Sequence, residues 1–130
     1  MTDKVKKKIK RLIEHYNLNC SVKEFQDKIN WHEISYYQRL SEDFIREFQD
    51  KVNWKQISIH QKLSEDFIRE FKYKVNWYWI SRYHTLLEDF MKEFKNKLDL
   101  NCLLETKKIS QDFYDFLLNE KVNRFELIDI

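Results

Sequence analysis

The stretch that decides the fold is DKVNWKQISIHQKLSEDFIREFK, residues 50–72, because the chain repeats it on both sides. The preceding segment, DKINWHEISYYQRLSEDFIREFQ (27–49), is identical to it at 16 of 23 positions, and YKVNWYWISRYHTLLEDFMKEFK (73–95) follows with more changes. A degenerate fourth copy begins at Asn96. SVKEFQDKIN (21–30) resembles the end of an earlier copy, and VNRFEL (122–127) the start of a fifth. Such a short fixed period indicates a repeat protein.

Each copy contains two amphipathic segments. In the second half of residues 50–72 the apolar residues fall on one helical face that continues into the next copy; they are Phe67, Ile68, Phe71 and Val75. In the first half Trp54 and Ile57 share a face, but Leu63 would point to the opposite side if the same helix continued. The pattern therefore predicts a break near Leu63 and two helices per copy.

The residues at the breaks are good helix starts. Ser64 stands where an N-cap is needed, and two carboxylates follow it in the first turn. At the other junction Asn53 is the expected cap, with Gln56 reaching back to close a capping box. The third copy has no serine at the position of Ser64, and we expect Thr85 and Glu88 to form a shifted capping box there.

These patterns predict an all-α fold of short helix–turn–helix repeats stacked as a small α-solenoid, because one copy alone cannot bury its apolar face. We expect one domain over residues 1–130: 1–26 as a basic helix and partial repeat that cap the array, 27–95 as three clear repeats, and 96–130 as a degenerate repeat and C-terminal cap. Glycine, proline and alanine are all absent. This bias is typical of an AT-rich genome, so the helical prediction rests on periodicity.

Two polar positions recur inside the copies. Ser35, Ser58 and Ser81 follow the isoleucine of the short helix, and we expect these small residues where helices cross closely. Gln38, Gln61 and His84 recur on the tryptophan face. For this second set we expect hydrogen bonds between copies or partial exposure, with a ladder of ligand-binding side chains as the alternative.

The sequence offers little for catalysis. The paired carboxylates recur at every helix start, which indicates a structural role, and the four histidines have no metal-binding spacing. We therefore predict no enzyme activity, no catalytic or metal-binding residues and no cofactor. Cys20 and Cys102 lie far apart, and we expect two reduced core thiols. No apolar run approaches the roughly 18 residues of a membrane span, and MTDKVKKKIKRLIEHY lacks the apolar centre of a signal peptide, so we expect an intracellular protein.

The repeat resembles a known group of sequences. The string W-x2-I-S-x2-Q-x-L-S-E-x-F-I-x2-F, read from Trp54 to Phe71, is similar to short tandem repeats in many proteins of amoeba-infecting giant DNA viruses. The resemblance covers residues 27–95. It implies a viral protein of an AT-rich genome, located in the host cytoplasm, and it implies no defined activity.

In a repeat protein the positions that vary between copies carry specificity. In the third copy Tyr78 and Arg82 are four residues apart, as are Trp79 and Tyr83, so the four side chains are expected to form an aromatic and cationic surface on one helix. Residues of these types are enriched at interface hot spots. We predict that this surface, extended by Tyr36 and Tyr37, binds a protein partner; the alternative is that the aromatic side chains pack against a neighbouring helix.

The two ends of the chain suggest further partners. At the N-terminus an apolar stripe at helical spacing consists of Val5, Ile9, Leu12, Ile13 and Tyr16. It leaves a basic face mostly outside, with Lys4, Lys7, Lys8 and Arg11. This face could bind nucleic acid or, less readily, an anionic membrane surface, or it could be the solvated side of a capping helix. Near the C-terminus Phe125, Leu127 and Ile128 begin a copy without its second helix, and we expect self-association through this end.

Overall fold

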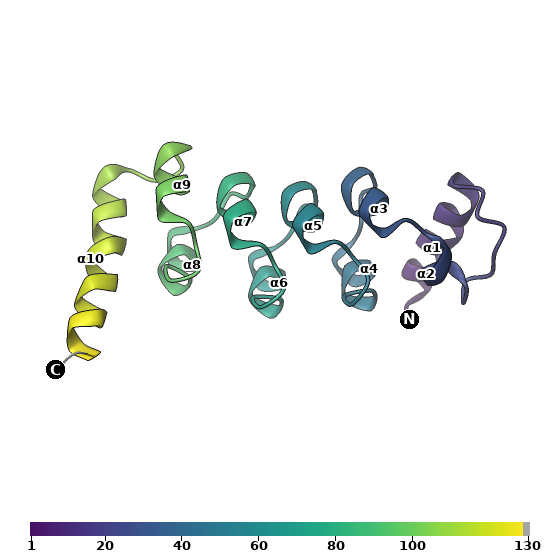
Figure 1. Ribbon diagram of the computed structural model, residues 1–130, viewed down its shortest axis with the longest axis horizontal. Helices are drawn as coiled ribbons and strands as arrows, with labels where there is room; N and C mark the ends of the chain where they lie inside the picture. The colour runs from purple at the N-terminus through teal and green to yellow at the C-terminus, as the bar shows by residue number, and fades with distance from the viewer. Residues whose placement is uncertain (129–130) are drawn as a thin grey trace. The chain divides into compact units, whose positions relative to one another are not determined.

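A computed structural model describes residues 1–128 and the side chains of residues 1–119. The chain separates into two compact units, residues 1–61 and 62–130, here called the N-terminal and C-terminal units. Every regular element within residues 1–128 is a helix; the helices within residues 25–105 are short, whereas the first and the last are longer (Figure 1). The prediction of an all-α array of short helix–turn–helix repeats is confirmed. The extent of a single domain over 1–130 stays a prediction.

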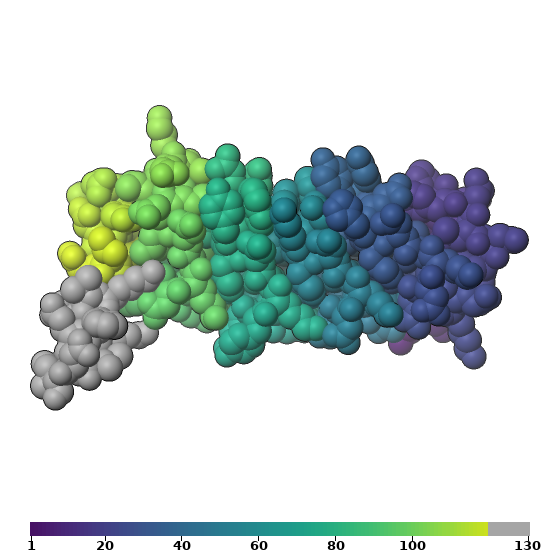
Figure 2. Space-filling view, viewed as in Figure 1, coloured from purple at the N-terminus to yellow at the C-terminus, as the bar shows by residue number. Residues whose placement is uncertain are grey.

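The N-terminal unit contains α1 (Asp3–His15), α2 (Phe25–Lys28), α3 (Trp31–Tyr37), α4 (Glu42–Glu47) and α5 (Trp54–His60). Within it α3 packs beside α5, and α4 lies on the other edge (Figure 1). Side chains fill the spaces between neighbouring ribbons (Figure 2).

The C-terminal unit contains α6 (Glu65–Glu70), α7 (Trp77–Tyr83), α8 (Glu88–Glu93), α9 (Leu100–Glu105) and α10 (Gln111–Ile128). Here α7 packs beside α9, α9 contacts α10, and α6 and α8 lie along the edge away from α7 (Figure 1). Its fully buried side chains include Ile68, Ile80 and Leu103. Matching positions of successive copies thus form the core, as expected for stacked repeats.

The predicted helix starts are present. The Ser64 Oγ accepts a hydrogen bond from the Phe67 N–H at 3.1 Å, and the Ser41 Oγ accepts one from the Phe44 N–H at the same distance. The Asn53 Oδ1 accepts from the Gln56 N–H at 3.1 Å. Each cap satisfies a backbone donor that the first helical turn leaves without a partner.

The capping box predicted for Gln56 is wrong. The backbone N–H of Asn53 instead donates to the Ser35 Oγ of the preceding copy at 3.1 Å, and the Gln56 Oε1 is buried without a hydrogen-bond partner. The same arrangement recurs in the C-terminal unit, where the Asp99 N–H donates to the Ser81 Oγ at 2.9 Å. The recurring serines are fully buried, as expected at helix crossings, and Ser35 and Ser81 also hydrogen-bond successive copies together.

The third copy starts its second helix without a side-chain cap, so the predicted Thr85–Glu88 capping box is also wrong. Leu87 occupies the N-cap position of α8 and lies 69% exposed, while Leu86 is buried. The second helix of the third copy therefore begins at the same repeat position as that of the second copy, with Leu87 in place of Ser64. The Leu87 N–H donates instead to the Glu65 Oε2 at 2.7 Å.

Two helices have different lengths from those that the apolar pattern indicates. The face from Phe67 to Val75 is buried as predicted, but α6 ends at Glu70, and a turn closed by the Val75 N–H to the Phe71 carbonyl at 3.0 Å carries the chain on. Conversely, α10 continues through residues 122–128, so the expected fifth copy does not begin there. The side chains of Phe125, Leu127 and Ile128 lie outside the described residues.

A clamp from the next copy holds the end of each of two short helices. The buried Gln61 amide Nε2 donates to the carbonyls of Ser35 and Gln38 at 3.0 and 2.6 Å, and its Oε1 accepts from the Leu40 N–H at 2.8 Å. The Lys108 Nζ donates to the equivalent carbonyls of Ser81 and His84 at 3.0 and 2.8 Å. Side chains thus satisfy helix-end carbonyls that a glycine-containing C-cap often satisfies.

Two other helices end in Schellman motifs without glycine. After α1, Asn17 takes a left-handed backbone conformation with φ 50°, and the Leu18 N–H donates to the Ile13 carbonyl at 3.0 Å. After α9, Lys107 takes φ 59°, and the Lys108 N–H donates to the Leu103 carbonyl at 2.9 Å. Asparagine tolerates this conformation well, whereas a lysine in it is strained.

Candidate partner-binding surface

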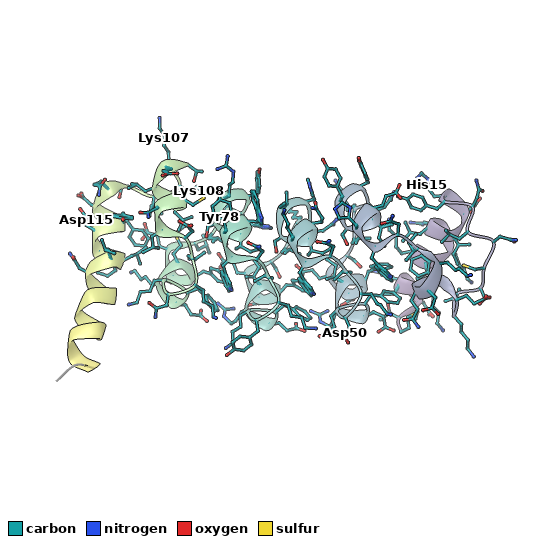
Figure 3. All side chains as sticks on the ribbon, viewed as in Figure 1. His15, Asp50, Tyr78, Lys107, Lys108 and Asp115 are labelled. Carbon is teal, nitrogen blue, oxygen red and sulfur yellow. The ribbon has the colours of Figure 1, made fainter. Side chains whose placement is uncertain are left out.

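Helix α7 carries the aromatic and cationic surface that the third copy predicts. The rings of Trp79 and Tyr83 stack with centroids 5.6 Å apart and an interplanar angle of 15°, and Tyr78 meets Trp79 edge-on at 4.7 Å. Tyr78 and Tyr83 are 42% and 53% exposed, Arg82 is exposed and Trp79 is half-buried. The four residues, called the α7 surface below, therefore lie together and face solvent for the most part. Figure 3 labels Tyr78 among them.

The helix geometry explains this arrangement. Ile80 and Ser81 of α7 are fully buried and fix which face of the helix points inward. Residues 78, 79, 82 and 83 then project from the remaining face, and side chains four residues apart meet on it. Three of the four side chains are therefore exposed and Trp79 is half-buried, and the choice between a partner-binding surface and packing against a neighbouring helix stays a prediction.

Arg82 lies between the aromatic rings of the α7 surface and polar groups near α9. Its guanidinium lies 5.8 Å from the Tyr83 ring centroid. A hydrogen bond with Tyr83 and the nearby Tyr78 hydroxyl raise the pKa of Arg82. Interactions of Arg82 with Cys102 and Lys108 place the same guanidinium beside α9. Arg82 thus presents a permanent positive charge between the exposed aromatic rings and the neighbouring helix.

The predicted extension, Tyr36 and Tyr37, lies on α3 in the N-terminal unit. The two rings are 4.4 Å apart, and Tyr36 also contacts His60 of α5 at 4.0 Å. Their exposed fractions are 42% and 72%. Tyr36 therefore joins two copies, whereas Tyr37 is the more available for a partner.

The basic face of α1 is formed as predicted. Val5, Ile9 and Leu12 are buried, and the residues expected to point outward are exposed except for Lys8, which is half-buried; they are Lys4, Lys7, Lys8 and Arg11. Burial, followed by the like charge of Arg11, lowers the pKa of Lys8. Val5, Ile9 and Leu12 thus pack within the unit, while Ile13 and Tyr16 of the predicted stripe are half-buried, and the outer face of α1 is mainly cationic.

Two hollows lie near the start of α1 within the N-terminal unit. One, of about 370 Å³, is lined in part by Lys6, Lys23, Glu47 and Phe48. The other, of about 530 Å³, is lined by residues that include Arg46 and Glu47. Both mix cationic and anionic side chains, so neither indicates the charge of a ligand.

The structure also bears on the predictions about metal ligands, cysteines and membrane-spanning helices. No cluster of three or more histidine, cysteine or acidic side chains suited to a metal ion occurs within residues 1–119. Both cysteines are free; Cys102 is buried, but Cys20 is only half-buried, which corrects its expected place in the core. Burial, with the nearby carboxylate of Asp99, raises the pKa of the Cys102 thiol. None of the helices within residues 1–128 is long and apolar enough to cross a bilayer.

One exposed aromatic residue was missed by the sequence reasoning. Tyr73, in the turn between α6 and α7, is 82% exposed and has the ammonium groups of Lys72 and Lys97 at 5.2 and 5.0 Å from its ring centroid. The signal was available, because the same position holds Asp27 and Asp50 in the earlier copies. The contact of Tyr73 with Lys97 of the next copy could not be predicted from the sequence.

Comparison with protein-family models, curated proteins and solved structures finds no match to this chain. The resemblance to giant-virus tandem repeats therefore stays a prediction, and so does every functional role assigned above.

Proposed function

We propose that this protein is a non-enzymatic helical-repeat scaffold that binds a protein partner through the α7 surface. The proposal rests on one observation: the side chains of the α7 surface contact one another on one helix and remain largely exposed. They are Tyr78, Trp79, Arg82 and Tyr83. Exposed aromatic side chains of this density are costly to keep in water, and they are the types that contribute most to binding free energy.

The contacts within the α7 surface favour binding for a second reason. Stacking of Trp79 on Tyr83 and the guanidinium of Arg82 over Tyr83 restrict the side-chain rotamers before a partner arrives. A pre-ordered surface loses less side-chain entropy on association, at about 0.5–1.5 kcal/mol per immobilised side chain. The α7 surface is therefore suited to act as a rigid anchor.

The biological setting is part of the same proposal. The tandem-repeat resemblance over residues 27–95 supports a giant-virus protein that acts inside the host cell, in its cytoplasm. The proposal also includes self-association of two protein chains through the C-terminal residues, which contain Phe125, Leu127 and Ile128.

The double variant Trp79→Ser/Tyr83→Ser tests the proposal. We expect it to abolish capture of the partner from source-cell extract and to lower the free energy of unfolding by only about 1–2 kcal/mol, since both side chains are at least partly exposed. The control is Leu87→Ser, which removes an exposed apolar side chain outside the α7 surface and should capture the partner normally. A loss of several kcal/mol would show that the α7 surface is structural, and equal capture by both variants would show that it does not bind the partner.

The basic face of α1 supports a second candidate function, binding of nucleic acid. Val5, Ile9 and Leu12 are buried while the cations face outward, so this face is better suited to contact phosphates than to insert into a membrane. Changing Lys4, Lys7, Lys8 and Arg11 together to Gln should reduce the slope of log affinity for duplex DNA against log salt by about 3–4. Binding that is absent in the wild type, or independent of salt, would exclude this function.

A further inference from the structure

The junctions between copies differ in charge along the chain. The three residues that end each copy and begin the next read QDK at 26–28 and 49–51, then KYK at 72–74 and KNK at 95–97. In the first two junctions, of which 26–28 lies in α2 and 49–51 in a turn, one aspartate offsets one lysine. In the last two the aspartate is replaced and a second lysine is added. The positive charge is therefore concentrated in the turns of the C-terminal unit.

The two basic turns meet at Tyr73. The Lys72 and Lys97 ammonium groups lie 5.2 and 5.0 Å from its ring centroid, one from each turn. Lys74 and Lys97 are exposed, whereas Lys95 is buried and does not contribute to this surface. Lys72, Tyr73, Lys74 and Lys97, called the Tyr73 edge below, thus combine an exposed aromatic ring with several cations.

The carboxylate of Glu93, which interacts with Lys72 of the Tyr73 edge, is already paired with an arginine. Lys72 helps to lower the pKa of Glu93, but the main cause is Arg69, whose Nε and Nη2 donate to the two Glu93 oxygens at 2.9 and 2.8 Å. Because a bidentate pair of this kind satisfies both charges, Lys72 retains a positive charge available to another anion.

The Tyr73 edge lies on a different side of the unit from the α7 surface. Asp50, at the position in the second copy that matches Tyr73, lies on the edge away from α3 and α5 in its own unit (Figure 3). By the repeat, Tyr73 occupies the corresponding edge formed by α6 and α8, while Tyr78 lies on α7. A ligand of the Tyr73 edge would therefore not compete with a partner on the α7 surface.

We propose that the Tyr73 edge binds single-stranded nucleic acid, with a base stacked on the Tyr73 ring and the lysines on the flanking phosphates. An exposed cation–π contact contributes only about 0.5–1 kcal/mol, less than the about 1–3 kcal/mol of a base stacked on an aromatic ring. A base can therefore displace one ammonium group from the ring face, and that ammonium then pairs with a phosphate.

The surroundings of Tyr73 argue against other anionic partners. The flanking apolar residues Phe71 and Val75 are buried, so the turn has no apolar group to insert into a lipid surface. A base that is paired and stacked in a duplex cannot also cover a side chain carried by a short turn. An acidic protein segment would satisfy the lysines but leave the ring face without a specific partner.

Fluorescence anisotropy of the full-length protein with a labelled oligothymidylate of about 20 nucleotides tests the proposal. Tyr73→Leu should weaken binding about fivefold or more, because it removes the stacking ring, while Tyr73→Trp should retain it. Lys72→Gln and Lys97→Gln should each reduce the salt slope by about 0.7. Since Tyr73 is 82% exposed, none of these changes should alter the helical circular dichroism.

Three controls make the outcome specific. Tyr37→Leu changes another tyrosine that is 72% exposed, and it should bind like the wild type. The effect of Tyr73→Leu should persist when the four cations of the α1 basic face are changed to Gln. Binding of inorganic polyphosphate, measured by calorimetry, should be unchanged by Tyr73→Leu because polyphosphate has no bases.

Several results would overturn the proposal. These are no binding of the oligonucleotide at low salt, no effect of Tyr73→Leu, and equal weakening of oligonucleotide and polyphosphate. Tyr73-dependent binding to polyglutamate or to anionic vesicles would assign the Tyr73 edge to an acidic protein or to a lipid surface instead.

Discussion

Replacing Gln61 by Met removes the clamp between the first two copies without changing the volume of the side chain much. The wild-type amide makes three hydrogen bonds, to the carbonyls of Ser35 and Gln38 and from the N–H of Leu40, and Gln61 is 4% exposed. The thioether of methionine can replace none of the amide's donors. The substitution therefore leaves a buried N–H and at least one buried carbonyl without partners.

The cost follows from this count. Each buried polar group left without a hydrogen bond costs about 1–3 kcal/mol, so Gln61→Met should lower the free energy of unfolding by about 3–5 kcal/mol. This is a large part of the about 5–15 kcal/mol typical of a small protein. The matched control is Gln26→Met, which changes an exposed glutamine and should cost no more than about 0.5 kcal/mol.

Urea unfolding followed by circular dichroism measures both variants. Gln61→Glu adds an internal check, because the introduced carboxylate would face two carbonyl oxygens; the loss should be largest at neutral pH and smaller once acid protonates the carboxylate and restores a donor. If Gln61→Met is no less stable than Gln26→Met, the clamp does not stabilise the array and the reasoning is refuted.

Three further predictions concern the C-terminal unit. Leu87→Ser should supply the missing N-cap of α8 and raise the free energy of unfolding by about 1 kcal/mol, measured by urea unfolding, with Ser64→Ala losing a similar amount as the reverse control. Lys107→Gly should raise it by about 0.5–1 kcal/mol by relieving the left-handed backbone, whereas Lys107→Ala should not. Arg69 lowers the pKa of Glu93 below its usual 4.5, so this ion pair stabilises the folded state above that pH and its contribution is lost as pH falls through the folded value. Glu93→Gln should therefore be less stable than the wild type at about pH 7 and equal to it well below the folded pKa, and a stability difference independent of pH would contradict this assignment.

Several features could be read from local sequence because their causes are local. A capping hydrogen bond at Ser64 joins residues three apart, and the stacking of Trp79 on Tyr83 joins residues four apart on one helix. Such contacts depend on helix geometry alone. The α7 surface could therefore be predicted residue by residue, although its exposure depends on which neighbours cover it.

The sequence-based predictions failed where a residue distant in sequence competes with a nearby one for the same hydrogen bond. Gln56 was well spaced to cap Asn53, but the Ser35 Oγ, 18 residues away in sequence, already accepts that N–H. The pairing of Tyr73 with Lys97 likewise required the geometry of the next copy. The spacing of residues within one copy does not show which side chains of the neighbouring copy will contact its polar groups.

By itself, the sequence determined the 23-residue period, the two helices in each copy and the serine and asparagine residues that begin them. The tertiary structure decided which polar groups connect the copies, with Ser35, Gln61 and Lys108 as the main examples. The physical reason is that a helix begins where nearby side chains satisfy its free N–H groups. The carbonyl ends of α3 and α7 are satisfied instead by side chains from the next copy, whose position is set only when the copies stack.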